Sequence, residues 1–155
     1  MKRSVTHHTF TIERVYDATP ARVFAAFAQA GPKRRWFAGE DDGFTTAEYQ
    51  LDFRVGGREL WRGKPPSNGP TVSYDARYQD IAPEQRIVLS YDMHVGDERI
   101  SVSLMTVELA PEGKGTRLKL TEQDAFLDGH DLPSAREHGT RELLEKLGTT
   151  LAEPA

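Results

Sequence analysis

The chain contains no cysteine among its 155 residues. This absence excludes a disulfide scaffold, a thiolate zinc site and a cysteine nucleophile, and it fits a cytoplasmic protein, which needs no oxidised thiols. A basic excess is also missing, because 20 Lys and Arg residues stand against 24 Asp and Glu residues, for a net charge of −4. Proteins that hold nucleic acid through its backbone need a positive surface, so we expect no nucleic-acid partner.

Long apolar runs are absent as well. The longest extends from Val23 to Ala28, whereas a membrane-spanning helix needs about 20 predominantly apolar residues. The basic residues at 2 and 3 are not followed by an apolar segment, so we expect no signal peptide. Apolar residues make up 37% and charged residues 28% of the chain, as in ordinary globular proteins. The length predicts one domain over residues 1–155.

Period-two alternation of apolar and polar residues dominates the middle of the chain. It predicts strands at residues 8–16, 49–55, 58–62, 74–81, 87–93, 100–109 and 116–122. Within the 100–109 segment the apolar parity changes between Leu104 and Met105, which predicts either a β-bulge or burial on both faces. Residues 63–70 are rich in Gly and Pro and predict a long hairpin loop.

Two short helices are expected after the first strand. Thr19 is a good N-cap, and Pro20 suits the first helical position, where its missing N–H has no intrahelical partner. Gly31-Pro32 is a helix-breaking pair and predicts the end of this helix. A second short helix then carries the Trp-Phe pair at 36–37.

A longer helix closes the chain. Ser134 and Glu137 have the spacing of a capping box. The expected inner face of this helix carries a leucine stripe with a Thr and an Arg one and two turns earlier, namely Leu143, Leu144, Leu147, Leu151, Thr140 and Arg136. Gly139 costs about 1 kcal/mol relative to Ala inside a helix, so we expect it to allow close packing.

Strands that are segregated from helices predict an α+β fold. The expected architecture is a curved antiparallel sheet of about six to seven strands, with one face to bury. The C-terminal helix is the large amphipathic element available to cover that face. The expected core covers about residues 8–152.

Five short motifs follow one another in a fixed order, at residues 18–24, 33–37, 52–57, 80–87 and 115–118. Together they resemble the START-like, helix-grip superfamily (SRPBCC). More narrowly, they resemble the branch related to the C-terminal domain of the activator of the heat-shock-protein-ninety ATPase. The resemblance implies a helix-grip fold with a cavity for an apolar small molecule between sheet and last helix. Members of the superfamily are carriers, cyclases, hydrolases and co-chaperones, so the fold does not decide the function.

The sequence departs from this family at one informative place. Relatives have Gly-Trp near the start of the last helix, whereas this chain has Gly139-Thr140. The bulky ring that would close one end of the cavity is absent. This predicts either a larger pocket or another aromatic side chain in its place.

Aromatic and methionine residues on the strands are the main candidates for ligand contacts. Each of them alone is explained by core packing. Collectively they predict a cavity, because a curved sheet covered by one helix encloses more volume than leucines fill, and ligand cavities are mostly apolar with a few polar groups. The candidate lining residues are Trp36, Phe37, Phe53, Trp61, Tyr74, Tyr78, Tyr91, Met93, Met105, Thr140, Leu144 and Leu147.

Charged candidates favour surface roles. Asp52 and Arg54 have the opposite parity from Phe53, so we expect them in solvent. A buried arginine–carboxylate pair among these residues or Glu59 would instead indicate anion binding or general-acid work. The Lys-Arg-Arg run at 33–35 predicts a solvated helix face.

Recognisable catalytic and metal-binding motifs are missing. The histidines, His7, His8, His94, His130 and His138, lack the spacing of a metal site. No serine stands in a Gly-x-Ser-x-Gly motif, and no glycine-rich loop has the pattern that cradles phosphates. We therefore expect no metal and no cofactor, and the sequence names no catalytic residue.

The first functional hypothesis is a binding protein that holds an apolar or amphipathic small molecule between the sheet and residues 134–152. One alternative is a co-chaperone-like interaction with the heat-shock ATPase in a stress response. Another is a cyclase or hydrolase that uses Tyr, Asp or Glu groups of the cavity as acid and base, which would require a buried carboxylate with a perturbed pKa. A homodimer, through an edge strand or the 36–37 region, and a monomer stay open as alternatives.

Overall fold

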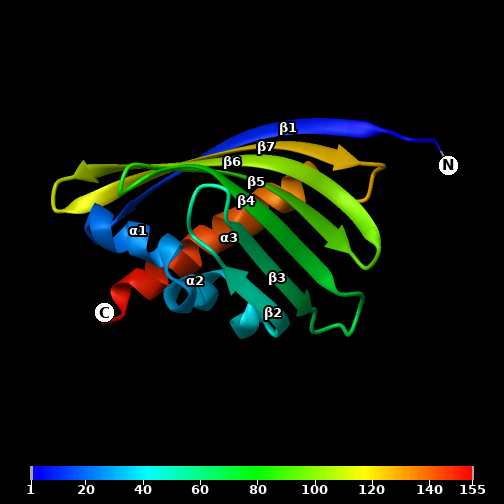
Figure 1. The fold of residues 1–155 in the computed structure, drawn as a ribbon, viewed down its shortest axis with the longest axis horizontal. Coiled ribbons are helices and arrows are strands. Elements are labelled where there is room, and N and C mark those ends of the chain that lie inside the picture. Colours follow the sequence, from blue (N-terminus) through cyan, green and yellow to red (C-terminus); the bar gives the residue numbers. More distant parts are fainter. Residues whose placement is uncertain (1, 155) are drawn as a thin grey trace.

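The computed structural model describes residues 2–154 and shows a curved sheet with three helices on one face (Figure 1). The strands are β1 (Val5–Tyr16), β2 (Thr45–Leu51), β3 (Arg58–Lys64), β4 (Val72–Ala82), β5 (Arg86–Val95), β6 (Glu98–Glu112) and β7 (Gly115–Leu127). All neighbouring strands are antiparallel. The predicted α+β helix-grip fold is confirmed.

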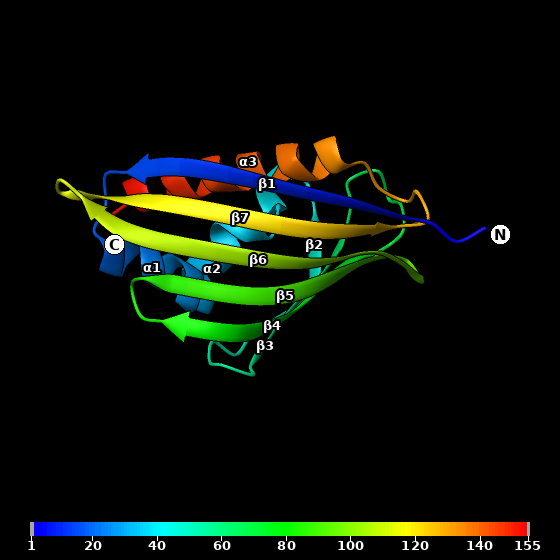
Figure 2. The same ribbon diagram turned by 90° about the horizontal axis from the view of Figure 1, so that it is seen from above.

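The sheet order is β1-β7-β6-β5-β4-β3-β2, which Figure 2 shows from above. From β2 to β7 each strand pairs with the next one along the chain, and β1 lies at the far edge beside β7. The connection from β1 to β2 carries α1 (Pro20–Ala28), α2 (Ala30–Phe37) and the short 3-10 turn η1 (Glu40–Asp42). The last element, α3 (Pro133–Ala152), crosses the face of the sheet that α1 and α2 also cover. None of the described helices is long and apolar enough to cross a membrane.

Helix α1 begins as the sequence predicts. The Thr19 Oγ1 accepts a hydrogen bond from the Arg22 N–H, and Pro20 occupies the first position. Gly31-Pro32 does not end this helix, because α1 already ends at Ala28 and the pair lies in the first turn of α2. A proline is tolerated there, since the N–H groups of a first turn have no intrahelical partners.

The expected capping box of α3 is wrong. Pro133 takes the first helical position, so Leu132 is the N-cap and Ser134 lies inside the helix. The leucine stripe is confirmed, with Leu144, Leu147 and Leu151 buried against the sheet.

Gly139 does not serve close packing, which is also a correction. A Cβ at Gly139 would have no neighbour within 4 Å, whereas a Cβ at Gly148 would lie 3.3 Å from the Tyr16 ring. The close approach of α3 to the sheet is therefore at Gly148. There the Tyr16 hydroxyl donates to the Leu144 carbonyl oxygen at 2.8 Å.

Strand β6 turns one set of alternate side chains toward the helices. Ser101 and Ser103 are buried on that face, whereas Val102 and Leu104 are 40% and 38% exposed on the other. Burial on both faces, one of the two expectations, is wrong. A bulge does occur, but at Ile100, which has no partner in the pairing with β5. The alternation of inward and outward side chains therefore changes at Ile100 and not between Leu104 and Met105.

A buried ion pair joins α2 to the sheet. Lys33 Nζ donates to Glu59 Oε1 at 3.0 Å, and the two residues are 3% and 0% exposed. Glu59 also accepts hydrogen bonds from the hydroxyls of Tyr49 at 2.7 Å and Tyr78 at 3.2 Å. The ammonium lies 4.4 Å from the centroid of the Phe37 ring, a distance that favours a cation–π contact.

The expected solvated face at 33–35 is therefore wrong for Lys33. Arg34 and Arg35 are exposed, but 3.6 residues per turn point one of three successive side chains back toward the sheet. Asp52 and Arg54 are exposed and pair with each other at 2.9 Å, as expected.

We expect Lys33→Met to lower the free energy of unfolding by about 3 to 5 kcal/mol, because it leaves the Glu59 carboxylate buried without its counter-charge. The double variant Lys33→Met/Glu59→Gln should recover much of this loss, since it buries no charge, its amide oxygen still accepts from one tyrosine and its NH2 group can donate to the hydroxyl of the other. Urea unfolding of both variants measures the difference. Arg34→Met, an exposed change on the same helix, is the control. Equal stability of the single and double variants would contradict the pairing.

Candidate ligand-binding cavity

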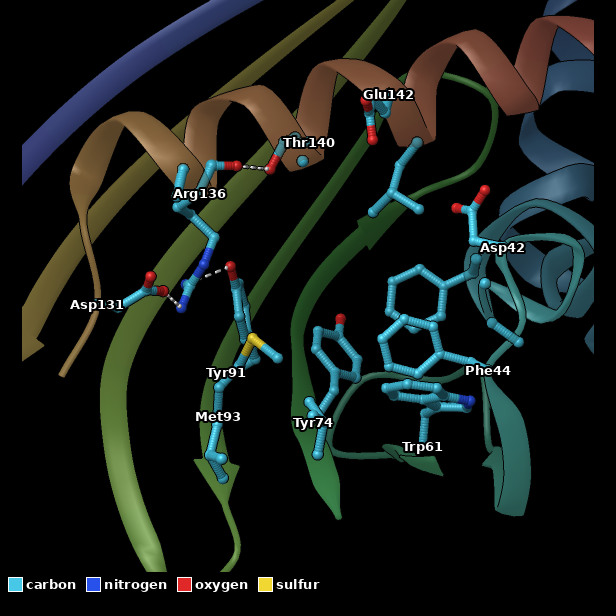
Figure 3. A pocket seen from close by; sticks show the side chains of 18 of the residues that line it. Asp42, Phe44, Trp61, Tyr74, Tyr91, Met93, Asp131, Arg136, Thr140 and Glu142 are labelled. Carbon is cyan, nitrogen blue, oxygen red and sulfur yellow. Dashed lines mark hydrogen bonds and ion pairs between the residues drawn. The ribbon is translucent and has the colours of Figure 1, made fainter. Parts of the chain in front are cut away.

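A cavity of about 370 Å³ lies between the sheet and α3 (Figure 3). Its walls come from β3 to β6, from α3 and from the segment that joins α2 to β2. Aromatic rings and methionines make up much of the lining, namely Phe37, Phe44, Trp61, Tyr74, Tyr91, Met93 and Met105. The cavity is therefore mostly apolar.

Strand register brings the central wall residues together. Trp61 on β3 lies opposite Tyr74 on β4, and Tyr74 lies opposite Met93 on β5. Directly opposite residues of antiparallel strands point to the same face, so these three form a row across the floor in Figure 3. The Tyr74 ring packs between Phe37 and Tyr91, with centroid distances of 4.8 and 4.9 Å.

A second, smaller pocket of about 30 Å³ lies deeper, between α2, α3 and the sheet. It shares Phe37, Tyr74, Met105 and Thr140 with the main cavity. Its volume holds little more than a water-sized group.

The structure places most of the predicted lining residues around these two spaces. Those on the main cavity are Phe37, Trp61, Tyr74, Tyr91, Met93, Met105 and Thr140. Those on the inner pocket alone are Trp36, Tyr78 and Leu144.

Phe53 and Leu147 line neither space. Phe53 lies beyond the end of β2 and packs edge-on against Phe24 and Tyr78, with centroid distances of 5.4 and 4.8 Å. Leu147 is fully buried in the core, so a larger side chain there would overpack the core without filling the cavity.

Several lining residues were missed at the sequence level. Phe44 sits in the turn after η1, where no periodic pattern exists to mark it. Gly139 lines the cavity, and because it has no side chain it leaves space there. Val72 and Val95 lie at the ends of β4 and β5 and could have been found by extending the alternation.

The position at which the family resemblance led us to expect tryptophan is open to the cavity. Thr140 and Gly139 both line the cavity, and the Thr140 Oγ1 donates to the Arg136 carbonyl oxygen at 2.9 Å. The hydroxyl is thus turned back to the helix, which leaves the methyl group for the cavity side. Of the two expectations, a larger pocket or another aromatic side chain in this place, the geometry favours the larger pocket.

Arg136 is the central group at the polar end of the cavity. Its Nη1 donates to the Tyr91 hydroxyl at 3.0 Å, and its Nη2 donates to the Ser101 hydroxyl at 2.8 Å and to Asp131 Oδ2 at 3.1 Å. Its guanidinium also lies 5.2 Å from the centroid of the Phe126 ring. Figure 3 shows the side chain reaching from α3 down to Tyr91. These contacts hold both Nη atoms in place and leave them little freedom to meet a ligand.

Two buried carboxyl groups on β7 lie behind this arginine. The Tyr91 hydroxyl donates to Glu122 Oε1 at 2.8 Å, and the Ser103 hydroxyl donates to Asp124 Oδ1 at 2.5 Å. Arg136 Nη1 is 3.9 Å from Glu122 and 3.8 Å from Asp124. Neither Glu122 nor Asp124 lines the cavity itself.

Burial raises the pKa of Glu122 to about 9, and the neighbouring Asp124 adds to this shift, against the opposing effects of Tyr91 and Arg136. At neutral pH the Glu122 carboxyl is therefore protonated. Glu122 Oε2 and Asp124 Oδ2 have no other hydrogen-bond partner in the described chain. A proton on Glu122 allows a hydrogen bond between the two carboxyl groups, which explains how the pair tolerates burial.

The histidines do not gather into a site. His8 faces Glu137, His130 faces Glu98 and His138 faces Glu142. Within residues 2–154 no group of three or more His, Cys, Asp or Glu side chains is arranged to hold a metal ion.

The raised pKa of Glu122 gives a testable pH dependence. The native state keeps this proton up to about pH 9, whereas an ordinary glutamic acid loses it near 4.5. Because the native state then binds more protons than the unfolded state, stability falls as pH rises from about 5 to 9. Glu122→Gln removes this titration and keeps an N–H donor for Asp124. Between pH 5 and 9 the stability of the variant should therefore rise relative to wild type by at least about 1.4 kcal/mol, one pKa unit.

Urea unfolding at several pH values measures this trend. Glu108→Gln, an exposed change, is the control and should run parallel to wild type. Parallel curves for Glu122→Gln as well would show that Glu122 is ionised in the native state.

Comparison with known proteins places this fold in a family. The profile of the family described as activator of Hsp90 ATPase homolog 1-like protein matches residues 17–152. Comparison with curated proteins gave no match.

Solved structures from rhizobia are similar over nearly the whole chain. The Mll3558 protein from Rhizobium loti is 54% identical, over 96% of this chain and 99% of that one, with a TM-score of 0.87. A protein from Rhizobium leguminosarum is 41% identical, over 97% and 98%, with a TM-score of 0.92. CalU16 from Micromonospora echinospora, 20% identical over 97% and 85% with a TM-score of 0.65, shares the fold. The chain therefore belongs to the activator of Hsp90 ATPase homolog 1-like family, with its SRPBCC-type fold.

Proposed function

We propose that this protein binds an apolar or amphipathic small molecule in the cavity between the sheet and α3. The observation that carries the proposal is the cavity of about 370 Å³ with aromatic walls and a few polar groups. Small-molecule sites in proteins are concave, mostly apolar and about 300 to 1,000 Å³ in volume. The volume lies near the lower end of that range, which supports a compact ligand.

Polar side chains at the open side of the cavity support an amphipathic ligand. Asp42 and Glu142 line the cavity, and their side chains are 57% and 58% exposed. Lys146 lies beside them and is held by Asp41 and Asp42. A ligand with one polar end can keep that end among these side chains and bury its apolar body against the rings.

Acid–base catalysis is a second candidate function, and the buried carboxyl pair favours it. Tyr91 lines the cavity and is hydrogen-bonded to Glu122, whose pKa is about 9. A protonated carboxyl behind a phenol is suited to general-acid work. Tyr91 is the lining residue that is hydrogen-bonded to Glu122, so a cyclase or hydrolase reaction would pass its proton through that hydroxyl. If Tyr91→Phe still binds the small molecule but no longer turns it over, acid–base catalysis through the Tyr91 hydroxyl is identified.

The family description supports a third candidate, activation of an Hsp90 ATPase. Such an activity would act through the protein surface. Stimulation of a purified bacterial Hsp90 ATPase by wild type, with equal stimulation by a variant whose cavity is filled, would favour this candidate over the binding function.

Gly139→Leu should fill the cavity at little cost in stability. A Cβ at this position meets no atom within 4 Å, and Leu is a better helix former than Gly by roughly 1 kcal/mol. We expect wild type to carry a non-covalent occupant in native mass spectrometry, or to gain thermal stability from a compound in a ligand screen. Gly139→Leu should lose the occupant, or bind the compound at least tenfold more weakly.

Thr149→Leu, which adds the same side chain at an exposed position of α3, is the matched control and should bind like wild type. Unchanged binding in Gly139→Leu would place the ligand elsewhere.

A further inference from the structure

The hydroxyl of Tyr74 differs from those of the other tyrosines in the chain. Four of the five tyrosine hydroxyls donate to an acceptor in the protein: Tyr16 to the Leu144 carbonyl, Tyr49 and Tyr78 to Glu59, and Tyr91 to Glu122. The Tyr74 hydroxyl has no hydrogen bond to any described residue. Tyr74 is nevertheless only 5% exposed.

This hydroxyl points into the main cavity. Tyr74 lines the cavity, and Figure 3 shows its oxygen directed away from β4, into the space between Tyr91 and Phe44. The packing against Phe37 and Tyr91 holds the ring in this orientation. The Tyr74 oxygen is not one of the fully buried unpaired atoms of the described chain, so it is accessible from the cavity. A ligand that excludes water from the cavity has to offer this hydroxyl an acceptor, because a polar group left without a hydrogen bond costs free energy. The position of the hydroxyl therefore indicates a partner in the cavity.

The surrounding charges indicate what kind of partner this is. Burial raises the pKa of Tyr74 well above its ordinary value, so the hydroxyl stays protonated and can donate. The cationic groups of the wall already have anionic partners, since Arg136 is paired with Asp131 and Lys146 with Asp41 and Asp42. An anionic ligand group would thus meet no unpaired cation, which leaves an uncharged acceptor as the better partner.

We propose that Tyr74 selects ligands by donating a hydrogen bond to one uncharged acceptor, such as a carbonyl oxygen, on an otherwise apolar molecule. This inference rests on the proposed binding function and adds its specificity-determining group. The ligand class is an apolar molecule built of a few rings, with a single carbonyl or comparable oxygen. Its apolar body would lie against Trp61, Phe44 and Met93, and its oxygen would accept from the Tyr74 hydroxyl.

Two probes of nearly equal shape test this proposal. Fluorene and 9-fluorenone have the same three-ring frame, and the second adds one carbonyl oxygen. Titration followed by intrinsic tryptophan fluorescence reports binding, because Trp61 lines the cavity. Wild type should bind 9-fluorenone about three- to tenfold more tightly than fluorene, the range expected for one net hydrogen bond.

Tyr74→Phe should abolish this preference. Its affinity for fluorene should equal that of wild type, and its affinity for 9-fluorenone should fall about three- to tenfold. Tyr49→Phe, which removes a hydroxyl outside the cavity, is the matched control and should keep the wild-type preference. Tyr74→Phe should also melt at the same temperature as wild type or higher, because it removes an unpartnered group.

The outcomes separate the two levels of the proposal. Binding of neither probe to wild type overturns the binding function for molecules of this size, and the role of Tyr74 with it. Binding of both probes without a preference, or a preference that persists in Tyr74→Phe, overturns the role of Tyr74 alone. A lower melting temperature of Tyr74→Phe would show that the hydroxyl has a partner within the protein, which also overturns it.

Discussion

The attachment of α3 to the sheet at two separate places is the constraint on which the rest of the structure depends. Toward its C-terminal end the helix is close to the sheet, with Gly148 against the ring of Tyr16 and leucines buried beneath. Toward its N-terminal end the long side chain of Arg136 reaches the hydroxyls of Tyr91 and Ser101 on the sheet. The length of the arginine side chain sets the distance between the helix and the sheet, and its hydrogen bonds hold the helix at that distance. The helix is therefore kept away from the sheet at the end where the cavity lies.

Two buried charged groups play different parts in this arrangement. The Lys33–Glu59 pair is balanced in charge, and both Glu59 oxygens accept hydrogen bonds, so the pair fixes α2 on the sheet without a residual charge. The group around Arg136 has three carboxyls, those of Glu122, Asp124 and Asp131, against one guanidinium, and the proton on Glu122 lowers this excess of negative charge. Buried ionic groups gain little stability over apolar packing. The presence of an extra acid behind Tyr91 and Arg136, which line the cavity, is thus easier to relate to function than to stability.

Much of the fold could be predicted from local patterns. Strand alternation, the Thr19-Pro20 helix start and the leucine stripe of α3 are local signals, because each depends on residues close in sequence. The candidate site was harder. Its aromatic wall was predicted by alternation, since inward residues of neighbouring strands share a face, but Phe44 lies in a turn and Gly139 contributes only space. The burial of Lys33 depends on Glu59, 26 residues away, and no local rule contains that information.

The pairing of β1 with β7 has a consequence for how the chain folds. Val5 lies opposite Leu127 in the sheet, so during synthesis the first strand of this fold pairs with its last strand. Strands β2 to β7 can form successive hairpins as they emerge, but β1 has no neighbour until β7 is complete. Such distant pairing slows folding, because the entropy of closing a long loop is lost before the contact forms. Until then the inner edge of β1 and the apolar underside of the sheet stay open to other chains, and synthesis of α3 completes the enclosure.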